Sequence, residues 1–340
     1  MLGAMLSIRN PRHALALPLL VVAAATGCGD DASSTSDAQV TAVATTTQVG
    51  DLARAVGGDR VDVRQLLKPN SDPHGYEPRP SDAAAVVEAD VVLRSGGDLD
   101  EWLDDLIENA GGDAPVVELS ESVAAIEGDP HAHDAEHAEE ERHAEEDRHA
   151  EEEHSDDPHW WQDPRNAVRA VAAIEAALAK ADPQGRARYR ENASAYTRRL
   201  RRLDRGVAAC IERIPPGKRR LVTTHDALGY YADRYGIEVV GAVIPSLSTA
   251  AQPSAGDTEE LVDQIERQDV EAIFPESSVD PKLERAIARE TGAQVGRPLW
   301  ADTLGPEGSD GETYVESIAS NTAALVEGLT GGAARCRPRA

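Results

Sequence analysis

The sequence predicts an α/β protein with two lobes, each a parallel sheet flanked by helices, joined by one long linking helix. Strand-like and helical segments alternate from residue 40 onward, one uninterrupted helical pattern occupies 184–214, and the alternation resumes over 218–331. Strands that alternate with helices are typical of parallel sheets, because each parallel connection needs a crossover that a helix supplies. A chain of 340 residues also exceeds one average domain, which suits two lobes.

The N-terminus predicts a lipoprotein signal peptide over residues 1–27 and a flexible tether over 28–39. Arg9 and Arg12 precede the apolar run LALPLLVVAAA, which is short for a membrane span and ends in small residues before Cys28. Small residues beside a cysteine resemble the processing site of bacterial lipoproteins; an ordinary secreted protein with a chance cysteine is the alternative. We therefore expect an extracytoplasmic protein, lipid-anchored through Cys28 to a bacterial membrane, at the cell surface or in the periplasm.

The N-terminal lobe is predicted over residues 40–183. Its strand-like segments are VTAVATTT, VDVRQLL, DVVLRSG and PVVEL, and its helical segments include QVGDLARAVGG, SDAAAVVEA, LDEWLDDLIENAG and NAVRAVAAIEAALAKA. Between them, residues 129–157 are dominated by acids and histidines and contain no core residue except alanine. Such a stretch buries too little apolar surface to order itself, so we expect a mobile insertion.

The linking helix is predicted over residues 184–214, where apolar residues recur at intervals of three and four. At a rise of about 1.5 Å per residue it would extend roughly 40 Å, so it can act as a strut between lobes. The C-terminal lobe is predicted over 218–331, from RRLVTT to ETYVESIASNTAALVEGL. Ligands of such lobes commonly bind in the cleft, at the loops that follow strand ends.

Composition limits the classes of partner. The formal net charge is -27, so the surface would repel a nucleic acid, whose binding needs a basic face. A cation is the more natural ligand, although many proteins are acidic merely for solubility.

Two cysteines remain besides Cys28, and export would place them where disulfides persist. We expect one bridge between Cys210 and Cys336, which would connect the C-terminal tail to the middle of the chain. Two free or intermolecular thiols are the alternative.

Only three histidines remain for the folded body once His13 of the signal and those of the insertion are set aside. His74 in DPHGYEP, His159 in DPHWWQDP and His225 in TTHDALGYY each fall in a loop next to a predicted strand or helix end. A lone loop histidine is more often a surface or capping residue, but three imidazoles and one oxygen complete a tetrahedral zinc shell. Asp302 in PLWADTLG follows the last predicted strand and is the expected fourth ligand.

These segments together resemble the metal-binding solute-binding proteins of zinc and manganese ABC importers, the ZnuA-like cluster A-I family. DPHGYEPRPSDAAAV, DPHWWQDPRNAV, LVTTHDALGYYADRYG and LWADTLGPEGSDGETYVESIASN resemble its four ligand loops. The resemblance implies His74 and His159 from the first lobe, and His225 and Asp302 from the second, as ligands. It further implies a rigid linking helix, limited lobe movement, and an ABC permease with its ATPase subunit as partners.

The expected function is non-enzymatic capture of Zn²⁺ as a transported ligand, by a monomer that binds no nucleic acid. Family members that prefer manganese typically carry glutamate where His225 stands, and imidazole favours zinc over manganese. Manganese is the alternative metal. A zinc hydrolase is an alternative function, but Asp302 would fill the position that water needs and no GxSxG motif is present. A metal-buffering adhesin is a further alternative.

Several neighbours are candidates for supporting roles. Glu77, Asp226 and Glu276 are acids that could accept the unliganded imidazole hydrogens, although Asp226 could equally cap a helix. Trp160 and Trp161 are expected to pack in the cleft.

The histidines of the insertion form a separate set of expected weak metal ligands. Several stand six residues apart, a spacing that rotates successive side chains by roughly 240° on a helix, so they would not share one face. A flexible chain of imidazoles and carboxylates could bind zinc weakly and pass it to the cleft; a solvated spacer is the alternative. These residues are His131, His133, His137, His143, His149 and His154.

Overall fold

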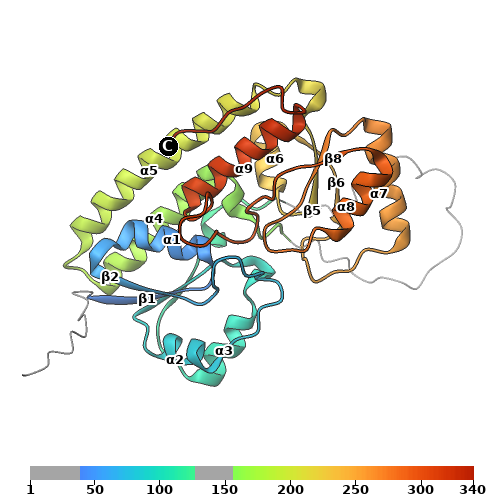
Figure 1. Cartoon of the computed structure of the whole chain (residues 1–340). Coiled ribbons are helices and arrows are strands. Elements are labelled where there is room, and N and C mark those ends of the chain that lie inside the picture. Colours follow the sequence, from blue (N-terminus) through green and yellow to red (C-terminus); the bar gives the residue numbers. More distant parts are fainter. Residues whose placement is uncertain (1–38, 127–155) are drawn as a thin grey trace, which may run out of the picture. The chain divides into compact units, whose positions relative to one another are not determined.

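The computed structural model describes residues 39–126 and 156–340, and these confirm the predicted fold class of two parallel α/β lobes joined by a long helix (Figure 1). The predicted signal peptide, Cys28, nearly all of the tether, and residues 127–155 with the six insertion histidines lie outside the described residues. Expectations about those segments therefore stay predictions.

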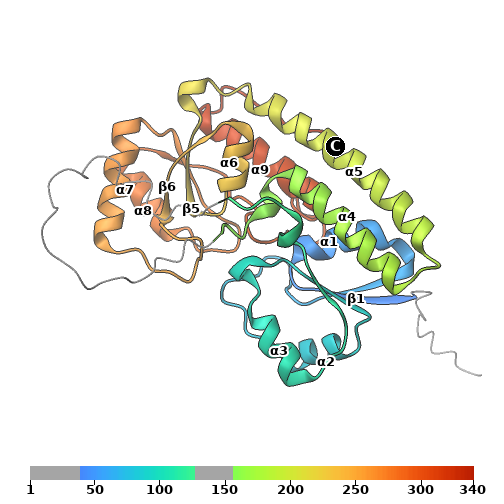
Figure 2. The ribbon, with the colours of Figure 1, turned by 180° about the vertical axis from the view of Figure 1, so that it is seen from behind.

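The first lobe contains a four-stranded parallel sheet in the order β2-β1-β3-β4. Its strands are β1 (Val40–Ala44), β2 (Val61–Gln65), β3 (Val91–Arg94) and β4 (Val116–Glu118). The helices between them are α1 (Thr47–Gly57), α2 (Pro80–Val87) and α3 (Trp102–Ala110), with short 3₁₀ turns at Gly58–Arg60, Gly97–Leu99 and Ser120–Ser122. Figure 2 shows α1 and α4 (Pro164–Ala181) over one face of this sheet and α2 and α3 over the other.

The second lobe repeats this topology with a parallel sheet in the order β6-β5-β7-β8. Its strands are β5 (Arg220–His225), β6 (Glu238–Ile244), β7 (Ala272–Phe274) and β8 (Gln294–Val295). Its helices are α6 (Gly229–Tyr235), α7 (Ala255–Gln268), α8 (Lys282–Thr291) and α9 (Tyr314–Leu329), and a 3₁₀ turn at Pro216–Lys218 precedes β5. A parallel bridge between Glu276 and Leu299 continues the pairing beyond β7 and β8.

Both sheets bury side chains on both faces, as parallel sheets covered by helices do. In β1, Ala42 and Ala44 join the main core, whereas Val43 between them packs with Val86 and Leu103 beneath α2 and α3. Successive side chains of a strand point to opposite faces, so the central strands β1, β3, β5 and β7 each contribute to two hydrophobic clusters. This double burial explains why these strands are apolar at successive positions.

The main core continues from one lobe into the other. It includes Val49 of α1, Tyr231 of α6 and Leu325 of α9, together with Leu200 of the linking helix. Because interiors are close-packed, a core shared by both lobes opposes large rotation of one against the other.

The linking helix is α5 (Arg186–Ile211), which is 26 residues long and therefore about 39 Å at 1.5 Å per residue. It begins two residues later and ends three residues earlier than predicted, within the usual uncertainty of helix ends. Tyr189, Leu203 and Val207 are buried on its inner face. Figure 1 shows α5 running beside α1 and α4 of the first lobe and α9 of the second.

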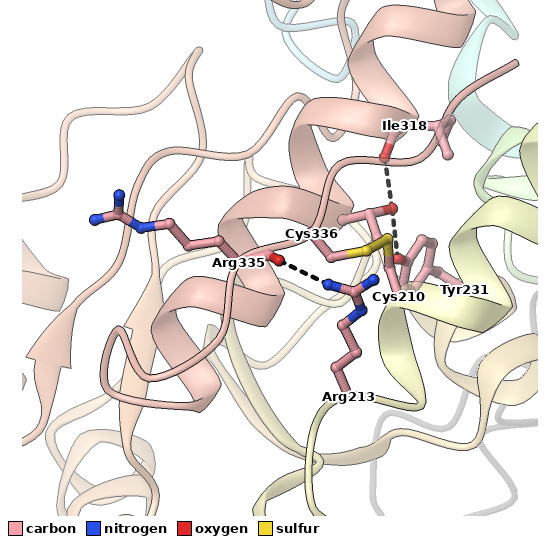
Figure 3. The surroundings of a disulfide bond; sticks show 7 residues. Cys210, Arg213, Tyr231, Ile318, Arg335 and Cys336 are labelled. Atoms are coloured by element: carbon pink, nitrogen blue, oxygen red, sulfur yellow. Dashed lines mark hydrogen bonds between the residues drawn. A yellow bond between two sulfur atoms is a disulfide. The ribbon is translucent and has the colours of Figure 1, made fainter.

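A disulfide joins Cys210, near the end of α5, to Cys336 in the C-terminal tail, with 5.4 Å between the Cα atoms (Figure 3). The Arg213 guanidinium donates a hydrogen bond to the carbonyl oxygen of Arg335 beside it, at 3.1 Å. The tail is thus attached covalently to the linking helix.

Among the described residues, no helix has both the length and the apolar character that crossing a membrane requires.

Candidate metal centre

The four predicted ligands lie at loops next to the ends of secondary-structure elements. His225 is the last residue of β5, and His74 lies in the segment between β2 and α2. His159 immediately precedes the 3₁₀ turn Trp160–Gln162, which leads into α4, and Asp302 follows the parallel bridge at Leu299. The carboxyl ends of strands are where α/β sheets place their ligands.

The structure brings all four side chains together at one point. The Nε2 atoms of His74 and His225 each lie 3.2 Å from Asp302 Oδ2, and His159 Nε2 lies 3.4 Å from Asp302 Oδ1. His159 Nε2 and His225 Nε2 are 3.3 Å apart. One ligand atom from each residue lies within 4.8 Å of every other. Two lobes contribute to this cluster, as the sequence predicted.

The donor atoms are buried, and apart from the contact between the Nε2 atoms of His159 and His225 they have no hydrogen-bond partner in the described part of the chain. Both carboxylate oxygens of Asp302 and the Nε2 of His74 have no hydrogen-bond partner among the described residues. Buried polar atoms are normally paired, so atoms left unpaired around a common centre indicate a ligand. Three imidazole nitrogens and one carboxylate match the donor set of a four-coordinate metal site. The cluster is therefore a candidate metal site made of three histidines and one aspartate.

Two of the imidazoles are oriented by carboxylates behind them. His159 Nδ1 lies 2.7 Å from Asp157 Oδ1, and His225 Nδ1 lies 2.7 Å from Glu276 Oε1. The same oxygens accept the backbone N–H groups of His159, at 2.8 Å, and His225, at 3.1 Å. With a carboxylate as acceptor, Nδ1 carries the proton and Nε2 presents its lone pair to the centre.

Three acids were considered from the sequence as partners of the ligand imidazoles. In the contacts just described, only Glu276 among them pairs with such an imidazole, that of His225. Glu77 is solvent-exposed. Asp226 does not cap α6, because that helix begins at Gly229 and has no side-chain cap. Asp157 was missed, although the sequence carried a signal for it in the repeated Asp-Pro-His of residues 72–74 and 157–159.

The loop that carries Asp302 follows the second sheet, yet side chains of the first lobe hold it in place. The carbonyl oxygen of Ala301 accepts hydrogen bonds from the Trp161 indole at 2.9 Å and from the Gln162 amide at 3.0 Å. The backbone N–H of Leu304 donates to the Thr47 hydroxyl at 2.8 Å. Trp161 was expected only to pack, but its N–H also positions the Asp302 loop.

At the centre of the site, the protonated form of His225 and the ionised form of Asp302 stabilise each other. Burial alone would lower the pKa of His225, but the carboxylates of Glu276 and Asp302 outweigh burial and raise the pKa well above its usual range. Burial alone would raise the pKa of Asp302, but the charges of His225 and His159 hold that pKa well below its usual range. The charged form of each group therefore favours the charged form of the other.

Metal binding is expected to release protons, and affinity to fall as the pH is lowered. The raised pKa of His225 favours the protonated ring in the free protein, whereas a ligand imidazole must be neutral. Titration calorimetry at about pH 6 and about pH 8, in buffers of different ionisation enthalpy, measures the number of protons released. An affinity that is constant over this range would contradict the pKa shift.

Comparison with known proteins agrees with this geometry. The chain is 34% identical over 321 residues to the manganese-binding lipoprotein MntA of Bacillus subtilis, covering 93% of this chain and 98% of that protein. It is 30% identical to the manganese-binding lipoprotein MntA of Halalkalibacterium halodurans, over 92% of this chain and 96% of the relative. The solved periplasmic zinc-binding protein TroA from Treponema pallidum is 28% identical, with a TM-score of 0.73, covering 85% of this chain and 99% of TroA.

A family model also matches most of the described fold. The match covers residues 42–328, from β1 to α9, and includes all four residues of the metal site. The family is described as ZnuA, zinc-uptake complex component A, periplasmic. Because both the family model and the relatives span nearly the whole folded chain, this protein belongs to the ZnuA family of metal-binding solute-binding proteins of ABC importers.

Proposed function

We propose that the protein captures a divalent transition-metal ion outside the cytoplasm and delivers it to the permease and ATPase subunits of an ABC importer. It is a solute-binding protein and not an enzyme, and it is an extracytoplasmic lipoprotein. The observation that carries the proposal is the convergence of His74, His159, His225 and Asp302 on one buried point. A catalytic zinc keeps one open position for water, whereas here a carboxylate takes the fourth position, so we reject the hydrolase alternative.

We propose that the isolated site binds zinc more tightly than manganese. Three imidazoles and one carboxylate form a donor set of intermediate softness, which suits zinc, whereas manganese favours oxygen ligands. In the general order of affinities for divalent metals, manganese also binds less tightly than zinc. The zinc-binding name of TroA supports the same choice.

Manganese is the second candidate, and similarity in sequence favours it over zinc. Both MntA relatives are named manganese-binding, and both are more similar to this chain in sequence, at 30% and 34% identity, than TroA is at 28%. The ion that is delivered in the cell depends on metal availability as well as on affinity. A protein whose isolated site prefers zinc can therefore still supply manganese where zinc is scarce.

A glutamate in place of His225 is expected to shift the preference of the site toward manganese. The substitution His225→Glu exchanges an imidazole for an oxygen donor, and we expect the ratio of zinc to manganese affinity to fall about tenfold or more. In the parent protein, Glu276 Oε1 lies 2.7 Å from His225 Nδ1, so the carboxylate of His225→Glu would face that of Glu276. The substitution is therefore combined with Glu276→Gln.

The measurement is metal content after dialysis against equal concentrations of zinc and manganese, with isothermal titration for each ion. Glu276→Gln alone is the matched control and should retain the preference of the parent protein. Manganese retained over zinc by the parent protein would contradict the zinc proposal. An unchanged affinity ratio in the double variant would contradict the role of His225.

The remaining expectations stay proposals. They are the signal peptide over residues 1–27, the tether over 28–39, the weak metal-binding role of the insertion and the monomeric state. An adhesin or extracellular metal buffer would act without the importer. A phenotype of deleting this protein that persists in a strain without the permease would therefore favour these alternatives.

A further inference from the structure

Two loops from different lobes meet beside the metal site. Residues 66–79 connect β2 to α2 and carry His74, and residues 245–254 connect β6 to α7. The Thr249 hydroxyl donates a hydrogen bond to Asp72 Oδ2 at 2.6 Å, and Asp72 Oδ1 accepts the backbone N–H of His74 at 3.0 Å. One carboxylate therefore joins a loop of the second lobe directly to a ligand of the first.

His74 is the ligand that depends most on its loop for its position. The Nδ1 atoms of His159 and His225 are held by carboxylates, but within the described residues no carboxylate pairs with His74 Nδ1. Its side chain is 6% exposed, whereas those of His159 and His225 are 0% exposed. His74 is therefore the ligand whose side chain lies nearest to solvent, although its Nε2 atom is buried.

The other ligands sit on parts of the fold that are harder to displace. His225 ends a central strand, and Ala301, next to Asp302, accepts hydrogen bonds from first-lobe side chains. Loops longer than the usual two to six residues, held by few contacts, open at lower free energy than packed strands and helices. The loop 66–79 exceeds that length, and within it the backbone of His74 is held through Asp72. Another link of this loop to the second lobe is the Asn70 N–H, which donates to the Leu304 carbonyl at 3.0 Å and to the Thr303 hydroxyl at 2.8 Å.

We propose that Thr249 and Asp72 are positioning residues that hold His74 against the bound ion, so that breaking their contact controls the rate of metal release. This inference rests on the proposed function, because it takes His74 as a metal ligand. The contact crosses from one lobe to the other, so movement between the lobes would act directly on the ligand loop. Docking on a permease could thereby trigger release without large rotation of the lobes.

The test is the rate of zinc release from the loaded protein into an excess of chelator, followed by stopped flow. Thr249→Val removes the hydroxyl and keeps the branched shape, and we expect release about tenfold faster, because the hydrogen bond to the charged Asp72 carboxylate is lost. Thr249→Ser restores the donor, and its release rate should lie within about twofold of the parent protein.

Thr258→Val is the matched control. It removes a hydroxyl that donates at 3.0 Å to the carbonyl oxygen of Ser254, within the same lobe and away from His74. Release from this variant should equal that of the parent protein, and the thermal midpoints of all metal-free variants should agree. Release from Thr249→Val at the parent rate, or equally fast release from Thr249→Ser or Thr258→Val, would overturn the inference. A parent protein that binds no zinc would instead refute the proposed function.

Discussion

Alanine in place of His159 is expected to weaken zinc binding more than any other single change considered. Its Nε2 atom points to the centre, its side chain is 0% exposed, and its Nδ1 is held by Asp157 at 2.7 Å. Loss of an outer partner of a metal ligand typically costs about 10–100-fold in affinity, and loss of the ligand itself should exceed that. The variant also leaves Asp157 buried without its imidazole partner. Zinc affinity is measured by competition with a chelator of known affinity.

The controls for this prediction come from the same chain. His74→Ala removes another ligand and should also weaken zinc binding strongly. His137→Ala removes a histidine of the insertion and should leave the tight site unchanged. Parent-like affinity in both His74→Ala and His159→Ala would refute the metal site, whereas weakened tight binding in His137→Ala would mean that the insertion contributes to it.

Removal of the disulfide is expected to cause the largest loss of stability. Cys210 and Cys336 are separated by 126 residues, and in the chain-entropy model a loop of this length contributes about 4 to 5 kcal/mol. Alanine is the suitable replacement because Cys210 is buried and a serine hydroxyl there would need a new partner. The free energy of unfolding is measured by urea denaturation of the metal-free protein.

The two single variants and the double variant should lose the same stability, because each breaks the same bond. Reduction of the parent protein should reproduce the loss. Zinc affinity should change little, since neither cysteine takes part in the hydrogen bonds around the site. A parent-like free energy of unfolding in the double variant would contradict the stabilising role of the bridge.

The amino-acid pattern alone was sufficient to predict the two lobes and the long helix. Alternating apolar segments and the helical spacing of Tyr189, Leu200 and Leu203 are local features, and local periodicity is what a sequence records directly. Three of the four candidate ligands could also be found from the sequence, because histidines are scarce in the folded body and each lies beside a strand or helix end. Asp302 was found from its position after the last predicted strand. The boundaries of α5 were less accurate, since helix ends depend on caps and packing.

The arrangement around those ligands required the tertiary structure. Glu276 lies 51 residues from the histidine that it orients, the Ala301 carbonyl accepts a hydrogen bond from Trp161 across 140 residues, and Thr249 reaches Asp72 across 177. Such contacts depend on how both sheets pack against α5 and on where two irregular loops meet, and no local period encodes either. The local pattern of residues was thus enough to select the four candidate ligands, whereas the contacts that hold each of them in place arise only when the two lobes pack together.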